Sequence, residues 1–200
     1  MKKQLLFVLA MTATLFTNTL SAHVNDFAAT TVQFSAIKKS MVVNLGNTEK
    51  EMVSVVIEDE KGNVLMSEKV KQSANFIKRY NMTQLENGAY TMTVTKTTIR
   101  TIQPFYITKS GIVITELEKK EKFMPVVTLK DNKLDVNVLL NNFGRIAVNI
   151  YDNAGRILKQ DKSLDALNFH KRYNLAQMPE GAYVVEVTAG DETFYHTVVK

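Results

Sequence analysis

The chain has 200 residues, of which 45% are hydrophobic and 22% are charged, and it contains no cysteine. The absence of cysteine excludes disulfides, thiolate chemistry and a lipid anchor attached to a cysteine. The formal net charge of +5 includes Lys2 and Lys3, and without them 25 − 2 = 23 basic residues face 20 acidic ones, which is too weak an excess to indicate nucleic-acid binding.

Residues 1–22 are predicted to form a secretory signal peptide. Lys2 and Lys3 give a positive start, and residues 5–16 are apolar apart from two threonines. This apolar run is too short to span a bilayer comfortably. The small residue Ala22 predicts cleavage directly after it, so we expect an exported chain in the periplasm, at the cell surface or outside the cell. No second long apolar stretch follows, and no membrane anchor is expected in the mature chain.

The chain contains one module twice, at an offset of 93 residues. Residues 76–81 (FIKRYN) align with residues 169–174 (FHKRYN), and residues 55–95 give 18 identities in 41 ungapped positions. We therefore expect a first domain at residues 27–108 and a second at residues 125–200. Residues 109–124 between them are expected to be a linker. Its first half is compatible with an extra strand, and its charge-dense second half is typical of a solvated segment.

Short strands recur along both modules. Val53, Val55 and Ile57 alternate with more polar residues, as Ile146, Val148 and Ile150 do in the second copy. This period of two predicts half-buried strands, about seven in each module, and no helical period of useful length appears after residue 22. The expected fold is all-β, with two tandem Ig-like or fibronectin-III-like β-sandwiches.

Each module contains an Asp-x-x-Gly turn between two apolar strands. Asp59 and Gly62 form the first turn, and Asp152 and Gly155 form the second. An aspartate at the start of a type I turn accepts hydrogen bonds from nearby N–H groups, and the glycine takes the positive φ that follows. A calcium loop is the alternative, but it requires several oxygen ligands at set spacing, and the two turns share only one acid.

A Gly-Ala-Tyr sequence starts a later strand in both modules. Gly88 and Tyr90 match Gly181 and Tyr183. A tyrosine directly after a tight turn predicts a tyrosine corner, in which the hydroxyl group donates to the upstream backbone. The alternative is a tyrosine that stacks on a sugar, and it is weaker because both copies place the residue where the architecture needs it.

The repeated Phe-x-Lys-Arg-Tyr-Asn strand is the one shared segment that could bind a ligand. In an extended strand Phe76, Lys78 and Tyr80 share one face, which suits the core, with the lysine near a sheet edge. The functional alternative is an aromatic and basic patch for an anionic glycan or peptide. Its candidate residues are Lys78, Arg79, Lys171 and Arg172.

The sequence shows no constellation of catalytic residues. His23, His170 and His196 have no metal-binding spacing, and no nucleophile elbow or phosphate-binding glycine loop occurs. We therefore expect no enzyme, no cofactor and no metal.

These motifs together resemble a known family. The order of apolar strand, Asp-x-x-Gly, Asn-Leu, Gly-x-Tyr and a final strand ending in lysine is similar to the C-terminal sorting module of bacterial type IX secretion. It also resembles small secreted Ig-like proteins of unknown function. The matching residues are Ile150, Asp152, Gly155, Asn174, Leu175, Met178, Gly181, Tyr183, Val185, Val187 and Thr197-Val198-Val199-Lys200. The resemblance implies an Ig-like sandwich that directs cargo across the outer membrane.

Three functional hypotheses follow. The first is a non-catalytic exported protein whose tandem modules have a structural or protein-interaction role, with a partner adding to an exposed sheet edge. The second is a type IX secretion substrate in which residues 125–200 act as the sorting domain and the secretion machinery is the partner. The third is a carbohydrate- or peptide-binding accessory module.

Overall fold

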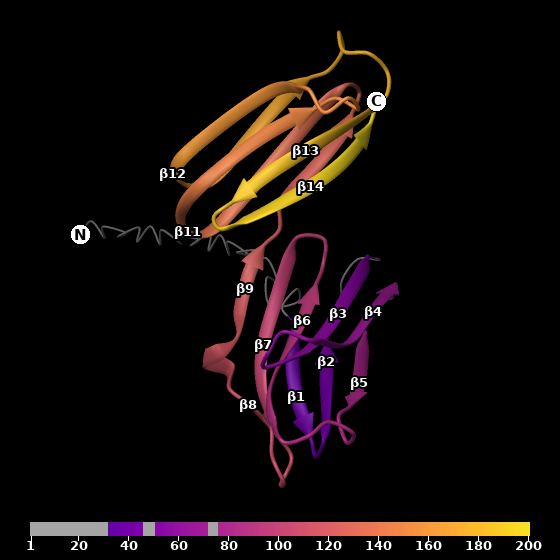
Figure 1. Cartoon of the computed structure of the whole chain (residues 1–200), viewed down its shortest axis with the longest axis vertical. Coiled ribbons are helices and arrows are strands. Elements are labelled where there is room, and N and C mark those ends of the chain that lie inside the picture. Colours follow the sequence, from indigo (N-terminus) through magenta and orange to yellow (C-terminus); the bar gives the residue numbers. More distant parts are fainter. Residues whose placement is uncertain (1–31, 46–50, 72–75) are drawn as a thin grey trace, which may run out of the picture.

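The computed structural model describes residues 32–45, 51–71 and 76–200. These residues form two β-sandwiches stacked along the long axis of the molecule (Figure 1). We call residues 32–123 module 1 and residues 124–200 module 2. The predicted signal peptide, its cleavage after Ala22, and His23 lie outside the described residues, as does the expected start of the first domain at residue 27. Within the described ranges, no helix has the length and apolar character needed to cross a membrane.

Module 1 packs a three-stranded sheet against a six-stranded sheet. The first has the order β1-β2-β5, and the second has the order β4-β3-β6-β7-β8, with β9 also paired to β7. All the pairings are antiparallel. The strands are β1 (Gln33–Ile37), β2 (Ser40–Asn44), β3 (Met52–Asp59), β4 (Val64–Lys71), β5 (Ile77–Asn81), β6 (Gly88–Thr95), β7 (Ile99–Ile107), β8 (Ile112–Ile114) and β9 (Lys120–Phe123).

The segment expected as a linker, residues 109–124, belongs to the second sheet of module 1. Its first half contains β8, which pairs with β7. Its charge-dense half contains a short 3₁₀ helix, η2 (Glu116–Glu118), and then β9, which pairs with the other end of β7. Alternating lysines suit an edge strand because one of its faces meets water, so the charge density that suggested a solvated linker also fits a strand.

Module 2 contains the strands β10 (Val126–Lys130), β11 (Lys133–Tyr151), β12 (Ile157–Asn174), β13 (Ala182–Ala189) and β14 (Glu192–Val199). Two of them are long because each runs through both layers. The first part of β11 pairs with β10 and with the end of β12, whereas its last part, from Ile146, pairs with the start of β12 and with β13. Register shifts between Leu139 and Ile146 separate the two parts. About seven short strands were expected, and five elements form in module 2 because β11 and β12 each continue from one layer into the other.

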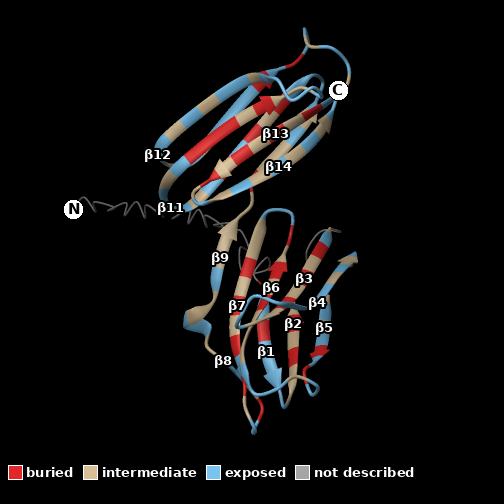
Figure 2. Ribbon diagram, in the orientation of Figure 1, coloured by how far each residue is buried: buried red, intermediate tan, exposed pale blue. Residues whose placement is uncertain are grey.

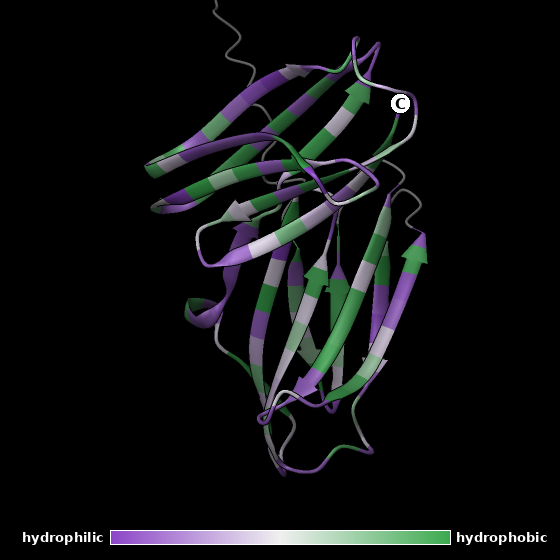
Figure 3. Cartoon of the chain, turned by 45° about the horizontal axis from the view of Figure 1, so that its top comes forward, coloured by the Kyte–Doolittle hydropathy of each residue, from purple (hydrophilic) through white to green (hydrophobic). Residues whose placement is uncertain are grey.

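Each module has its own hydrophobic core between its two layers (Figure 2). Inward residues alternate with exposed ones, so apolar and polar segments alternate along the ribbons in Figure 3. The predicted inward residues Val53, Val55 and Ile57 are at most 2% exposed, and Ile146, Val148 and Ile150 are fully buried. The expectation of an all-β protein with two tandem Ig-like sandwiches is confirmed.

Candidate functional site

The two Asp-x-x-Gly turns have the same geometry. Asp59 Oδ1 accepts from the N–H groups of Lys61 and Asn63, each at 2.9 Å, and Gly62 has φ +80°. The hydrogen bond from the Asn63 side chain is the main cause that lowers the pKa of Asp59. The Asp59 carboxylate therefore stabilises the turn between β3 and β4.

The corresponding turn of module 2 joins β11 to β12. Asp152 Oδ1 accepts from the N–H groups of Ala154 and Arg156, at 3.0 and 2.9 Å, and Gly155 has φ +76°. The backbone hydrogen bond from Arg156 is the main cause that lowers the pKa of Asp152. No group of three or more His, Cys, Asp or Glu residues could hold a metal ion in the part of the chain that the structure describes.

At one end of each sandwich, a tyrosine hydroxyl group donates a hydrogen bond to the backbone of the preceding loop. Tyr90 Oη donates to the carbonyl of Glu86 at 3.0 Å, and Tyr183 Oη donates to the carbonyl of Pro179 at 2.5 Å. Both acceptors lie four residues upstream, which is the hydrogen bond of a tyrosine corner. Gly88 starts β6, and Gly181 has φ +147° and exchanges two backbone hydrogen bonds with Lys200.

The side chain of Lys200 also belongs to this end of module 2. It is only 6% exposed, and its ammonium group donates to the carbonyls of Met178 and Ala176, at 2.5 and 3.3 Å. A buried ammonium group needs such acceptors. Residue Ile107 occupies the equivalent position of module 1, where it is an ordinary core residue. Lys200 therefore makes an interaction at the corner of module 2 that its module 1 counterpart does not make.

In module 1, two predicted binding-patch residues lie on opposite faces of the edge strand β5. Tyr80 is buried and Ile77 is 65% exposed, so Lys78 shares the inward-facing side with Tyr80 and Arg79 lies on the outward side. Lys78 Nζ donates to both carboxylate oxygens of Glu68 at 2.7 Å.

In module 2, Lys171 and Arg172 lie in the last part of β12. Lys171 Nζ donates to Asp161 at 2.5 Å, and Arg172 makes two hydrogen bonds with Asp135, at 2.6 and 2.8 Å. Lys78, Lys171 and Arg172 are thus each paired with an acid of their own module, and the structure does not bring the four candidates together as one basic surface.

These contacts reveal an acid–lysine–tyrosine cluster that occurs in both modules. In module 1, Glu68 accepts from Lys78 and from Tyr80 Oη, the latter at 2.6 Å. Burial raises the pKa of Glu68, but the two hydrogen bonds outweigh burial and leave it below its ordinary value. Burial, together with the neighbouring carboxylate, raises the pKa of Tyr80 far above its ordinary value. The cluster ties β4, in one sheet, to β5, in the other.

In module 2, Asp161 takes the place of Glu68. It accepts from Lys171 and, at 2.8 Å, from Tyr173 Oη. The pKa of Asp161 is likewise lowered by these hydrogen bonds against the effect of burial, and burial with the carboxylate raises that of Tyr173. Sequence analysis missed the two acids, although the 93-residue offset places Glu68 on Asp161 and so conserves the charge.

A second charged cluster joins the two modules. Glu192 of β14 accepts from Arg100 of β7 at 2.6 Å and from Lys122 of β9 at 2.5 Å. The hydrogen bond to Lys122 is the main cause that lowers the pKa of Glu192 and also the main cause that raises the pKa of Lys122. The guanidinium of Arg100 lies 5.9 Å from the ring centroid of Phe194. Only the tertiary structure brings these residues together, since they are far apart in the sequence.

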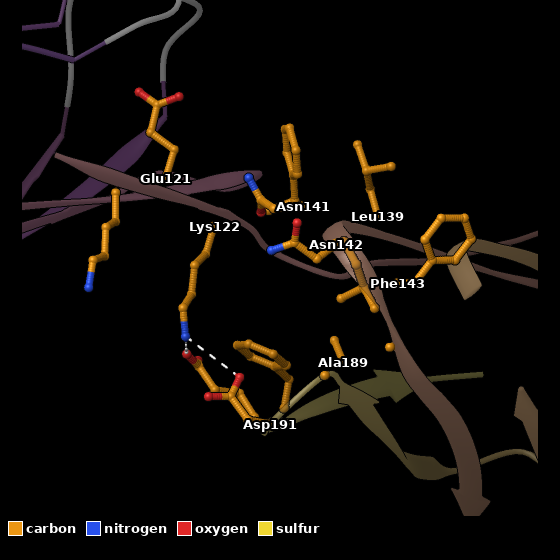
Figure 4. Close-up of a pocket in the computed structure, with 15 residues that line it drawn as sticks. Glu121, Lys122, Leu139, Asn141, Asn142, Phe143, Ala189 and Asp191 are labelled. Atoms are coloured by element: carbon orange, nitrogen blue, oxygen red, sulfur yellow. Dashed lines mark hydrogen bonds and ion pairs between the residues drawn. The ribbon is translucent and has the colours of Figure 1, made fainter. Parts of the chain in front are cut away.

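A cleft of about 490 Å³ opens beside this cluster, between the modules. Figure 4 shows Lys122 pointing toward Asp191, with Asn141 and Asn142 extending from β11 on the other wall. The cleft combines apolar side chains with amides and charges, and it lacks any arrangement of an acid, a base and a nucleophile. His170 is exposed on β12, and His196 is half-buried, with burial lowering its pKa.

The fold defines the chain as a tandem Ig-like protein. A comparison with protein families adds information about module 2. Residues 130–200 match the family described as "Secretion system C-terminal sorting domain". The match runs from the end of β10 to Lys200, so it covers nearly the whole sandwich of module 2. The resemblance expected from the sequence is confirmed for this region. No curated protein matches the chain in a sequence comparison.

The solved structures that are similar to the chain include three with low sequence identity. They are "Biofilm associated protein - BSP domain" (11% identity, TM-score 0.29, covering 84% of this chain and 29% of that one), chicken CNTN1 FN1-FN3 domains (9%, 0.27, 82% and 60%) and a "tetra-tandem repeat in extending region of large adhesion protein" (12%, 0.27, 84% and 47%). The chain therefore spans less than two thirds of the length of each of these structures.

Proposed function

We propose that this chain is a non-catalytic exported protein in which residues 125–200 act as the sorting domain for type IX secretion. The observation that carries the proposal is the sorting-domain match over residues 130–200. The structure supports it because these residues form a sandwich with a separate core, so they can act as one folded unit. In this proposal the predicted signal peptide directs export across the inner membrane, module 2 is recognised by the secretion machinery, and module 1 is exported with it.

The test uses module 1 as a matched control for module 2. Residues 125–200 and residues 27–123, which keep β8 and β9 with module 1, are each fused behind a signal peptide and a reporter protein, and expressed in a bacterium that has type IX secretion. We expect the reporter with residues 125–200 at the cell surface or in the medium, and the reporter with residues 27–123 in the periplasm. Equal distribution of the two fusions, or export that persists in a strain lacking the pathway, would refute the sorting role.

A second function, protein interaction through a sheet edge, is favoured by a separate observation. β14 ends the strand order β10-β11-β13-β14, and among the described residues no strand pairs with its outer side. An unpaired strand edge offers backbone donors and acceptors to an extended segment of another protein. Such an interaction gives the exported chain a structural or binding role after transport, and it is independent of how the chain is sorted.

A further inference from the structure

The edge of β14 can be compared directly with its counterpart in module 1. β7 occupies the same place in module 1, and there β8 and β9 both pair with its outer side. In module 2, β14 pairs with β13 on one side, and no described strand pairs with the other. Figure 1 shows β14 as the outermost strand of its sheet. The same fold thus accepts an added antiparallel strand at this edge, and module 1 shows what such a strand looks like.

The hydrogen-bond pattern identifies which backbone groups are available. Lys200 and Gly181 exchange two backbone hydrogen bonds, so every second residue before Lys200 is bonded to β13. The residues between them direct their N–H and C=O groups outward. They are Thr193, Tyr195, Thr197 and Val199, and all four side chains are exposed.

β14 also lacks the features that usually protect an edge. The span Glu192–Val199 contains no lysine, arginine or proline, whereas the edge strands β4, β5 and β12 carry lysines. Tyr195 is 67% exposed and Val199 is 74% exposed, although both lie on a regular strand of eight residues. An exposed edge strand without such protection is a template for strand addition.

We propose that the outer edge of β14 binds an extended, basic peptide segment of another protein as an additional antiparallel strand. The proposal deepens the second function above and rests on it, while the sorting role does not depend on it. Charge gives the reason for a basic segment. Glu186 lies directly opposite Tyr195 on β13, and its carboxylate accepts hydrogen bonds from the uncharged side chains of Asn149 and Tyr151. This register places Glu186 next to the edge strand, and its carboxylate raises the pKa of the Tyr195 hydroxyl.

Module 1 provides the same chemistry in its own covering strand. Lys120 pairs with Ile102, the counterpart of Tyr195, and Lys122 pairs with Arg100, the counterpart of Thr193. At the other end, Val113 pairs with Tyr106, the counterpart of Val199. The matching strand for β14 therefore has a β-branched residue opposite Val199 and lysines opposite Tyr195 and Thr193.

The probe is a fluorescent peptide, Ile-Val-Ile-Thr-Thr-Lys-Val-Lys-Phe, whose first residue lies opposite Lys200 and whose last lies opposite Glu192. It is titrated into the mature chain and followed by fluorescence anisotropy. N-methylation of its fourth and sixth residues removes two N–H groups that face β14, and we expect binding to weaken about tenfold or more. N-methylation of the third and fifth residues, which face away, is the matched control and should weaken binding much less. Equal losses for the two peptides, or no binding of the unmodified peptide, overturn the proposal.

Variants of β14 locate the binding edge. Thr197→Pro removes an outward N–H group, and Pro104 already occupies the equivalent position of β7, so the variant is expected to fold and to lose peptide binding. Thr193→Lys opposes a lysine of the peptide and should weaken binding, whereas Thr193→Glu should strengthen it. Wild-type affinity in folded Thr197→Pro, or an unchanged affinity in both Thr193 variants, contradicts the proposal. Sedimentation that shows two copies paired at β14, with the peptide excluded, overturns it in favour of self-association.

Discussion

The two modules have matching cores, turns and corners, and corresponding strands carry equivalent inward-facing residues. In module 1, β2, β3, β4 and β5 supply the described part of this region. In module 2 the corresponding segments are the continuous strands β11 and β12, with register shifts where they pass from one layer to the other. The inward-facing residues are equivalent in the two cases. The comparison shows that the alternation of buried residues fixes the sandwich in both copies.

The modules differ at one sheet edge. β7 is covered along its outer side by β8 and β9, whereas no described strand covers β14. The same strand edge can therefore be covered in one copy of a duplicated fold and exposed in the other. The covered copy then serves as a structural control for the exposed one.

The largest expected effect tests whether the two cores are independent. Ile57 and Ile150 are counterparts in the two cores, and both are almost fully buried. Ile150→Ala should destabilise module 2 by about 2–5 kcal/mol through lost burial and a residual cavity. Ile57→Ala should do the same to module 1. Urea unfolding followed by module-specific NMR signals should show two separable transitions, each shifted by only one variant. A single transition shifted equally by both variants would mean that the modules unfold as one unit.

The next largest effect concerns the acid–lysine–tyrosine clusters. Asp161→Ala leaves the Tyr173 hydroxyl group without its acceptor, which we expect to cost module 2 about 1–3 kcal/mol. Glu68→Ala should act in the same way on module 1 through Tyr80. Thermal unfolding of each variant provides the measurement. A matched control is Asp161→Asn, which keeps an acceptor oxygen and should cost less than Asp161→Ala; a larger loss in the asparagine variant would argue against the hydrogen bond as the cause.

A smaller effect is expected at the tyrosine corners. Tyr183→Phe removes one hydrogen bond from a tyrosine that is 3% exposed, at a cost of about 1 kcal/mol. Tyr90→Phe removes the equivalent bond from a more exposed tyrosine, so its cost should be lower. Chemical denaturation of the two variants side by side gives the comparison. The interpretation fails if Tyr90→Phe proves the more destabilising of the two.

The smallest effect is a pH dependence confined to module 2. Burial lowers the pKa of His196 in the folded state, so the unfolded chain binds the proton more readily. This contribution to stability is complete above the unfolded pKa, about 6.5, and is lost as the pH falls below it. His196→Gln, which introduces the residue found at the equivalent position in module 1 (Gln103), should flatten the dependence. Urea midpoints at about pH 7.5 and about pH 5.5 measure it, and an equal dependence in wild type and variant would exclude His196 as its source.

The fold and the local motifs could be predicted from the sequence because they depend on neighbouring residues. The alternation of apolar and polar residues predicted that Val53, Val55 and Ile57 face inward. The Asp-x-x-Gly spacing predicted that Asp59 and Gly62 form one turn. The charged segment at residues 116–122 was expected to be a solvated linker, because charge density alone does not distinguish a linker from an edge strand. Its pairing with β7 depends on backbone partners about twenty residues away.

The candidate basic residues show a related limit of prediction from the sequence. Lys78, Lys171 and Arg172 are identifiable as cations from the sequence, but their acidic partners lie on other strands or on other parts of the same long strand. Charge neutralisation in the folded state therefore could not be deduced from the local motif. The repeat does conserve an acid at Glu68 and Asp161, and this is the signal that was available in the sequence.

By itself, the sequence determined that this protein is two copies of one β-sandwich, because a period of two and the turn residues act over a few neighbouring positions. The tertiary structure alone decided which cations are neutralised, how Glu192 joins the modules and which strand edge lacks a described partner. These features depend on pairs of residues brought together from distant parts of the chain. For this reason the repeated motifs predict the architecture. The proposal about binding rests on the outer strand edge, which is covered in β7 and has no described partner in β14.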